Sequence, residues 1–351
     1  MLSYLLKRLL NGFFVLFGVV SVVFFLFNVL PGDAAQMTLG QRSDISSVEA
    51  VNRELGLDKP LYQQYFIYLN DLSILSLHEA TEENREKYQY RGLFNLGEYT
   101  LVLKPPYLRR SYQSRQTVNQ IIVAAVPGTA VLALAAMVIA TFFGLLLGGL
   151  AALFAHSWID RTAVSLSIIG ISAPSYFASI LVAYLFGFVW QSFTGLSMTG
   201  SLFVVDPFEG RRLALQNLIL PAVTLGIRPL AIIVQLSRNT FLEVLGQDYV
   251  RTARAKGLSE WQVMRRHVLR NALGPVITAV SGWFASLLAG AVFVEYIFGW
   301  KGLGKVTVDA LMKFDLPVVM GAVLFIALAF IVINILVDLA YAWLDPRIRL
   351  Q

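Results

Sequence analysis

The chain has 351 residues, of which 57% are hydrophobic and 14% are charged, and its formal net charge is +6. Soluble domains carry about 25% charged residues, so this composition argues against a soluble protein and for one with several membrane spans. The absence of cysteine excludes disulfides, thiol nucleophiles and cysteine-ligated metal sites, and three scattered histidines disfavour a histidine metal cluster. The positive charge does not indicate nucleic acid, because cytoplasmic loops of membrane proteins are rich in lysine and arginine.

The first predicted element is a transmembrane helix within residues 1–30. Leu9 to Leu30 is a run of 22 residues without charge, and it follows Lys7 and Arg8. A cleaved signal peptide is the alternative, but the apolar region of a signal peptide has about 7–15 residues. We therefore expect a retained helix with a cytoplasmic N-terminus, because positive charges precede it.

Residues 31–119 form the one long hydrophilic segment, which we expect outside the cytoplasm. Ser46 and Glu49 are spaced as a capping box for one helix, and Pro60 is placed to begin another. The charged stretch HEATEENREKYQYRG, residues 78–92, is predicted to be an irregular surface insertion.

The core segment, residues 120–351, holds the other apolar runs. Ile121 to Ala155 has 35 residues without charge, which suits a long tilted helix. Within it Gly144, Gly148 and Ala152 recur every four residues, a spacing that lets another helix backbone approach closely. The remaining spans are predicted at Thr162–Phe193, with an interruption at Ala173-Pro174-Ser175, and at Asn217–Leu236, Pro275–Phe298 and Pro317–Leu344.

Six spans place both termini in the cytoplasm, together with the turn at His156–Arg161 and the loop at residues 237–274. That loop carries seven Lys or Arg residues against three Asp or Glu residues, so charge and span count agree on orientation. The predicted fold is an all-α integral membrane protein with six transmembrane helices.

One motif resembles a phosphate-binding loop. Residues 299–305, GWKGLGK, fit G-x-x-x-x-G-K, but the Ser or Thr that should follow is Val306. The motif also follows a membrane helix instead of a β-strand, so a tight turn is the better interpretation. No nucleophile elbow, zinc-protease motif or carboxylate pair stands out, so we expect no enzymatic activity and no bound cofactor or metal.

Three ionisable residues fall inside predicted spans and are candidates for a translocation pathway: Arg228, Glu295 and Asp338. A charge within a span costs about 2.5–3.5 kcal/mol on insertion scales, so each of the three is a candidate for lining a water-filled path. The alternative for each residue is a structural pair or a side chain that extends to the membrane interface.

The basic loop contains a predicted pair of short helices. Tyr249 to Lys256 favours a helix that Gly257 ends in a left-handed conformation, and Ser259 is placed to cap a second helix, Glu260 to Leu269. A helix bound to lipid is the alternative. Small residues alternate with basic ones along the first helix, which favours docking into a groove on a protein.

The chain resembles the permease subunits of ABC importers of the dipeptide, oligopeptide and nickel type, the binding-protein-dependent inner-membrane components. The resemblance covers nearly the whole chain and is carried by GISAPSYF, LILPAVTLG, LEVLGQDYVRTARAKGLSE, RHVLRNALGPV and VEYIFGWKGLG, in this order along the sequence.

The resemblance implies that the loop docks a coupling helix into an ATPase subunit. The conserved glycine of the family pattern falls on Gly257 and its second alanine on Ala253, whereas Arg251 and Thr252 replace its glutamate and first alanine. The predicted coupling residues are Asp248, Tyr249, Val250, Arg251, Thr252, Ala253, Arg254, Ala255, Lys256 and Gly257.

The resemblance further implies an importer subunit of the bacterial inner membrane that forms half of a pathway for di- or oligopeptides. Its expected partners are a second, homologous permease, two ATPase subunits that use ATP and Mg²⁺, an extracytoplasmic binding protein and the lipid bilayer. Nickel chelates or sugars are alternative cargoes. An ion-gradient-driven transporter and a membrane scaffold without transport activity are alternative functions.

Overall fold

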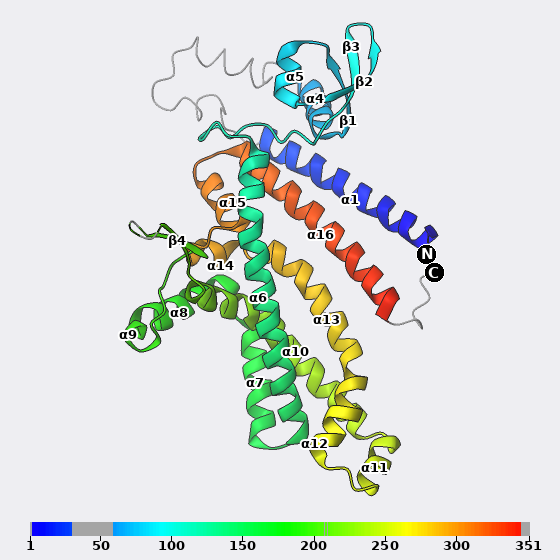
Figure 1. The fold of residues 1–351 in the computed structure, drawn as a ribbon, viewed down its shortest axis with the longest axis vertical. Coiled ribbons are helices and arrows are strands. Elements are labelled where there is room, and N and C mark those ends of the chain that lie inside the picture. Colours follow the sequence, from blue (N-terminus) through cyan, green and yellow to red (C-terminus); the bar gives the residue numbers. More distant parts are fainter. Residues whose placement is uncertain (1, 30–58, 207, 209, 345–351) are drawn as a thin grey trace. The chain divides into compact units, whose positions relative to one another are not determined.

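The computed structural model describes residues 2–29, 59–206, 208 and 210–344. Within these residues helices predominate (Figure 1). The predicted capping box at Ser46 and the basic C-terminal tail lie outside the described residues. The chain divides into two compact units, and each is described by itself. One unit holds residues 1–8, 125–305 and 328–351, and the other holds residues 9–124 and 306–327.

The longer helices are α1 (Leu2–Val29), α6 (Val118–Leu153), α7 (Trp158–Ser172), α8 (Ser175–Tyr184), α10 (Gln216–Leu245), α13 (Leu269–Gly290), α15 (Leu303–Met312) and α16 (Leu316–Leu344). The shorter helices are α4 (Leu61–Leu72), α5 (Glu82–Tyr88), α9 (Gln191–Thr194), α11 (Asp248–Ala255), α12 (Glu260–Val263) and α14 (Val292–Ile297), with π-helical turns η2 (Leu185–Val189) and η3 (Met264–Val268). The strands are β1 (Leu75–Glu79), β2 (Arg91–Leu96), β3 (Tyr99–Leu103), β4 (Phe203–Asp206) and β5 (Gly210–Leu213).

Within the described residues, four helices are long and apolar enough to cross a membrane: Leu6–Leu26, Val118–Leu153, Gln216–Leu245 and Leu316–Leu339. The pair α7 and α8 with η2, bent by 111°, makes a fifth if it is one broken span. Helix α13 covers much of the predicted fifth span. The mostly helical membrane class is confirmed, and the count of six spans stays a prediction.

Helices α6 and α10 approach each other closely at the predicted glycines. A Cβ atom on Gly148 would lie 1.9 Å from Oγ of Ser237 and 2.8 Å from the carbonyl oxygen of Val234. One turn earlier, the carbonyl oxygen of Gly144 accepts a hydrogen bond of 3.2 Å from the Ser237 hydroxyl. The close packing predicted for these two glycines is therefore confirmed, because no side chain fits between the backbones.

The predicted irregular insertion at residues 78–92 is wrong, because it folds into regular structure. Strands β1, β3 and β2 form an antiparallel sheet in that order, and α5 lies between β1 and β2 in the chain. Thr81 caps α5 by accepting a hydrogen bond from the Asn84 amide. The charged composition hid this order, because the strands are short and β1 points the polar side chains of Ser76 and His78 inward.

Buried polar side chains hold this small domain, residues 59–124, together. Asp71 is 5% exposed, and its Oδ1 accepts a hydrogen bond of 2.9 Å from the Tyr88 hydroxyl. The Lys104 ammonium donates to the Asp71 carbonyl oxygen, and the Arg109 guanidinium lies 3.7 Å from Asp71 Oδ2. Burial raises the pKa of the Asp71 carboxyl, and it lowers the pKa of Lys104 to about 8.

Candidate translocation and coupling site

A break between α7 and α8 shapes the membrane part of the candidate site. Pro174 has no amide hydrogen, and the residue before a proline favours an extended backbone. Ala173 accordingly takes φ −67° and ψ 127°, which ends α7. The chain resumes as α8 after Pro174, at the sharp bend between the two helices. Thr162–Phe193 is therefore two helices with an interruption where the sequence predicted it.

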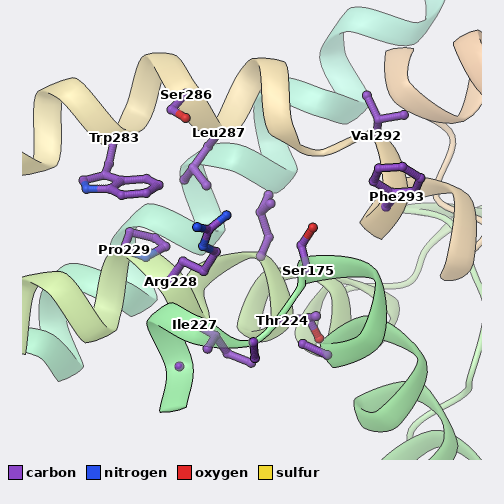
Figure 2. A pocket seen from close by; sticks show the side chains of 14 residues that line it. Ser175, Thr224, Ile227, Arg228, Pro229, Trp283, Ser286, Leu287, Val292 and Phe293 are labelled. Carbon is purple, nitrogen blue, oxygen red and sulfur yellow. The ribbon is translucent and has the colours of Figure 1, made fainter. Parts of the chain in front are cut away.

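A pocket of about 390 Å³ lies between this break, α10 and α13. Its polar lining comes from Ser175, Thr224, Arg228 and Ser286, and Trp283 forms part of its apolar wall. Figure 2 shows the Arg228 side chain extending from α10 toward the space below α13. The sequence analysis found the arginine but missed the hydroxyls, because single serines and threonines in apolar helices give no distinctive signal.

Arg228 gives this pocket a positive charge. It is the single charged residue in the sequence from 213 to 237, and none of the 14 residues that line the pocket is acidic. The Arg228 side chain is exposed in this single chain, whereas its neighbour Pro229 is buried. An arginine at this place favours an anionic occupant or a partner carboxylate.

The structure places Glu295 away from the Arg228 pocket. Its side chain is fully buried, and Oε2 accepts hydrogen bonds from the amides of Gly304 at 2.7 Å and Lys305 at 3.2 Å. These amides begin helix α15, where a carboxylate is stabilised by the unpaired N–H groups. Glu295 thus stabilises the GWKGLG segment. The glycines of this segment form a turn, as the sequence predicted.

Asp338 is also placed outside the pocket. Its Oδ2 lies 2.8 Å from the Arg8 guanidinium, which links α16 to the first helix by an ion pair. Of the three pathway candidates, only Arg228 therefore lines the pocket. The contacts of Asp338 therefore agree with the alternative given for it above, a structural ion pair.

The basic loop folds as two short helices around a glycine turn. Helix α11 spans Asp248–Ala255, and Gly257 has φ +83°, the left-handed conformation expected of it. Ser259 caps α12 in a reciprocal capping box with Gln262. The second helix does not end at Leu269, because η3 continues it into α13 and Pro275 lies inside that helix.

One side of α11 packs against its own chain. Val250 is 0% exposed and Ala253 is 6% exposed, and both belong to an apolar cluster with Phe241, Val263 and Met264. The other eight predicted coupling residues, Asp248, Tyr249, Arg251, Thr252, Arg254, Ala255, Lys256 and Gly257, are exposed. Val250 and Ala253 are three residues apart, so they lie on the same side of the helix. This buried face holds α11 against its own chain, and the opposite face stays exposed, which we call the free face.

Ion pairs and hydrogen bonds also connect parts of the loop and its neighbours at three points. The Arg254 guanidinium donates to both carboxylate oxygens of Glu260, at 2.8 and 3.1 Å, across the glycine turn. The Tyr249 hydroxyl accepts from the Asn271 side chain at 3.0 Å. A partly buried pair between Arg238 and Asp160 joins α10 to the start of α7. Sequence analysis missed this last pair, because its members are 78 residues apart.

Residues 144–350 match the family model described as binding-protein-dependent transport system inner membrane component, and residues 1–85 match the N-terminal model of the same group. The chain belongs to this family. The resemblance noted from the motifs is therefore confirmed, and the family is one of membrane transport components, not of enzymes.

Relatives match the chain over its whole length. It is 38% identical, over 100% of both chains, to the di/tripeptide transport system permease protein DppB of Pseudomonas aeruginosa (strain UCBPP-PA14). It is 35% identical, over 99% of both chains, to the glutathione transport system permease protein GsiC of Escherichia coli (strain K12). The fold is similar to a chain of the MetNI methionine ABC transporter in inward-facing conformations, with 15% identity, a TM-score of 0.50, and coverage of 65% of this chain and 97% of that one.

Proposed function

We propose that this chain forms half of the pathway through which an ATP-driven importer moves di- or oligopeptides. The full-length similarity to a di/tripeptide permease and a glutathione permease supports the peptide cargo. The coupling role rests on one observation about helix α11. Its buried Val250 and Ala253 attach it to the rest of the chain, and its basic side stays exposed. A rigid element with one free face is suited to transmit a movement from a partner.

The proposed assembly contains a second permease, two ATPase subunits and an extracytoplasmic binding protein. The ATPases bind ATP and Mg²⁺, and this chain binds no cofactor. The loop at residues 237–274 and both termini face the cytoplasm, because lysine and arginine are concentrated there. The chain is then a protein of the bacterial inner membrane, and its residues 31–119 lie on the side opposite the cytoplasm.

The first test is the composition of the assembly. The tagged chain, solubilised in mild detergent, is expected to co-purify with an ATPase that carries a phosphate-binding loop. Vesicles that contain the assembly are expected to take up dialanine only when ATP and the binding protein are present. Uptake driven by an ion gradient without ATP would instead support a secondary transporter, and the absence of any ATPase would support a scaffold.

The second test separates coupling from folding by a matched pair of glycines. Gly257 has φ +83° and Gly97 has φ +71°, and a Cβ atom would meet nothing within 4 Å at either position. Gly257→Arg and Gly97→Arg therefore impose similar backbone strain, but only the first adds bulk beside α11. We expect Gly257→Arg to abolish uptake and ATPase co-purification while the chain still inserts, and Gly97→Arg to retain both. Equal losses in the two variants would contradict the coupling role.

A further inference from the structure

We propose that the Arg228 pocket binds the C-terminal carboxylate of the peptide during its passage, so that Arg228 selects substrates with a free carboxyl end. This inference rests on the proposed function and names the part of the substrate that the site recognises. The pocket carries an unbalanced positive charge, because Arg228 is the only ionisable residue among those that line it.

An arginine at membrane depth is unfavourable unless water, an acid or a ligand compensates it. Within the described residues, the ion pairs of the neighbouring helices involve other side chains, such as Asp160 with Arg238 on α7 and α10. The acidic residue of α14, Glu295, is fully buried and directed to α15. Arg228 is thus left facing the pocket.

The groups that line the pocket match a carboxylate. A guanidinium matches a carboxylate as a planar double donor, and hydroxyl groups can satisfy the remaining lone pairs of its oxygens. Ser175, Thr224 and Ser286 supply hydroxyls from three different helices around Arg228 (Figure 2). The Thr224 hydroxyl already donates to the Leu220 carbonyl oxygen at 2.7 Å, which leaves Ser175 and Ser286 as the better donors.

The pocket also has a suitable size for part of a small ligand. Its volume of about 390 Å³ is within the range of about 300–1,000 Å³ that is usual for small-molecule sites. Arg228 and Ser286 are exposed in this single chain, as expected if a second permease completes the wall. The carboxylate is the feature that every unmodified peptide shares, so one arginine can serve cargoes with different side chains.

The test uses the absence of cysteine from this chain. Ser286→Cys places a single thiol in the pocket, and its labelling is followed on this chain in the purified, complete assembly. A negatively charged methanethiosulfonate reagent is compared with a positively charged one of similar size. We expect Arg228 to favour the anionic reagent, and Arg228→Met to reduce the ratio of the two rates by about tenfold or more. Arg228→Lys keeps the charge and should keep most of the ratio.

Protection by substrate then identifies the ligand group. Dialanine at millimolar concentration should slow labelling of Ser286→Cys, and dialanine amide should do so far less. Both peptides should protect equally poorly in the Arg228→Met background. A ratio that does not change with Arg228→Met, or equal protection by the acid and the amide, would overturn the proposal. ATP-driven uptake by the native assembly is measured separately, so a failure of peptide transport is distinguishable from a failure of carboxylate recognition.

Discussion

Charged side chains are used differently in the small domain of residues 59–124 and in the basic loop of residues 237–274. In the small domain, Asp71 and Lys104 are at most 5% exposed. The Asp71 carboxylate accepts a hydrogen bond from the Tyr88 hydroxyl, and the Lys104 ammonium donates one to the Asp71 main-chain carbonyl oxygen. In the loop, the side chains of Arg251 and Asp248 are 73% and 95% exposed although they form an ion pair. The apolar residues of α11, not its charges, fix it in place.

This difference separates charges needed for folding from charges available to a partner. A buried ion that loses its partner is strongly destabilising, whereas an exposed ion pair contributes little to stability. The loop can therefore exchange its exposed pairs for contacts with another protein at small cost. The buried network of the small domain has no such freedom, and four substitutions or conditions test the contrast.

The largest effect is expected for Asp71→Ala. It leaves the Tyr88 hydroxyl and the Arg109 guanidinium without their shared carboxylate, while Lys104 keeps the main-chain carbonyl oxygen of residue 71, and the expected cost is about 3–5 kcal/mol. Hydrogen exchange of the β1 and β3 amides in the full-length protein should accelerate accordingly. Asp71→Asn preserves the shape and an acceptor for Tyr88, so it should lose less. Equal protection in native protein and Asp71→Ala would show that the network does not hold this domain.

Acidification should weaken the same domain through His78. Burial, with Lys104 and Lys87 nearby, lowers the pKa of His78 to about 4 from 6.5. The unfolded chain therefore binds a proton between these values that the folded domain does not, so the stability supplied by neutral His78 is complete above pH 6.5 and is lost as the pH falls toward 4. We expect about 2 kcal/mol less stability at pH 4.5 than at pH 7. His78→Gln should remove this part of the pH dependence, and an unchanged profile in that variant would exclude His78 as its source.

A smaller effect is expected at the turn of the loop. Gly257→Ala adds no contact within 4 Å, so its cost comes from φ +83° alone and should be about 1 kcal/mol. Amide exchange in α11 should rise by about fivefold while exchange in β3 stays unchanged. No change in α11 would indicate that the turn relaxes without strain.

The smallest effect on stability is expected for Arg254→Ala, which removes the exposed pair with Glu260. Such a pair contributes about 0.2–1 kcal/mol, so α11 should remain protected from exchange. ATP-driven uptake should nevertheless fall, because the free face of α11 loses a cation. Loss of α11 protection larger than in Gly257→Ala would contradict the view that apolar packing, and not this pair, holds the helix.

Local signals account for the parts of the molecule that could be predicted from the sequence. The left-handed Gly257, the cap at Ser259 and the break at Pro174 each follow from one or two residues. Features that depend on distant partners could not be predicted. The inward orientation of Ala253 depends on Phe241 and Met264, and the pair of Asp160 with Arg238 joins helices far apart in the chain.

The buried side chain of Glu295 occupies the loop that matches the first seven positions of a nucleotide motif. Gly302 and Gly304 leave room for Glu295, since a Cβ atom on Gly302 would lie 2.4 Å from its carboxylate. Two amides of this loop, those of Gly304 and Lys305, are thus already engaged by the carboxyl group of Glu295 in the same chain. A comparison of sequence letters alone cannot distinguish a loop whose amides are free to bind phosphate from one whose amides already bind a side chain of the same protein.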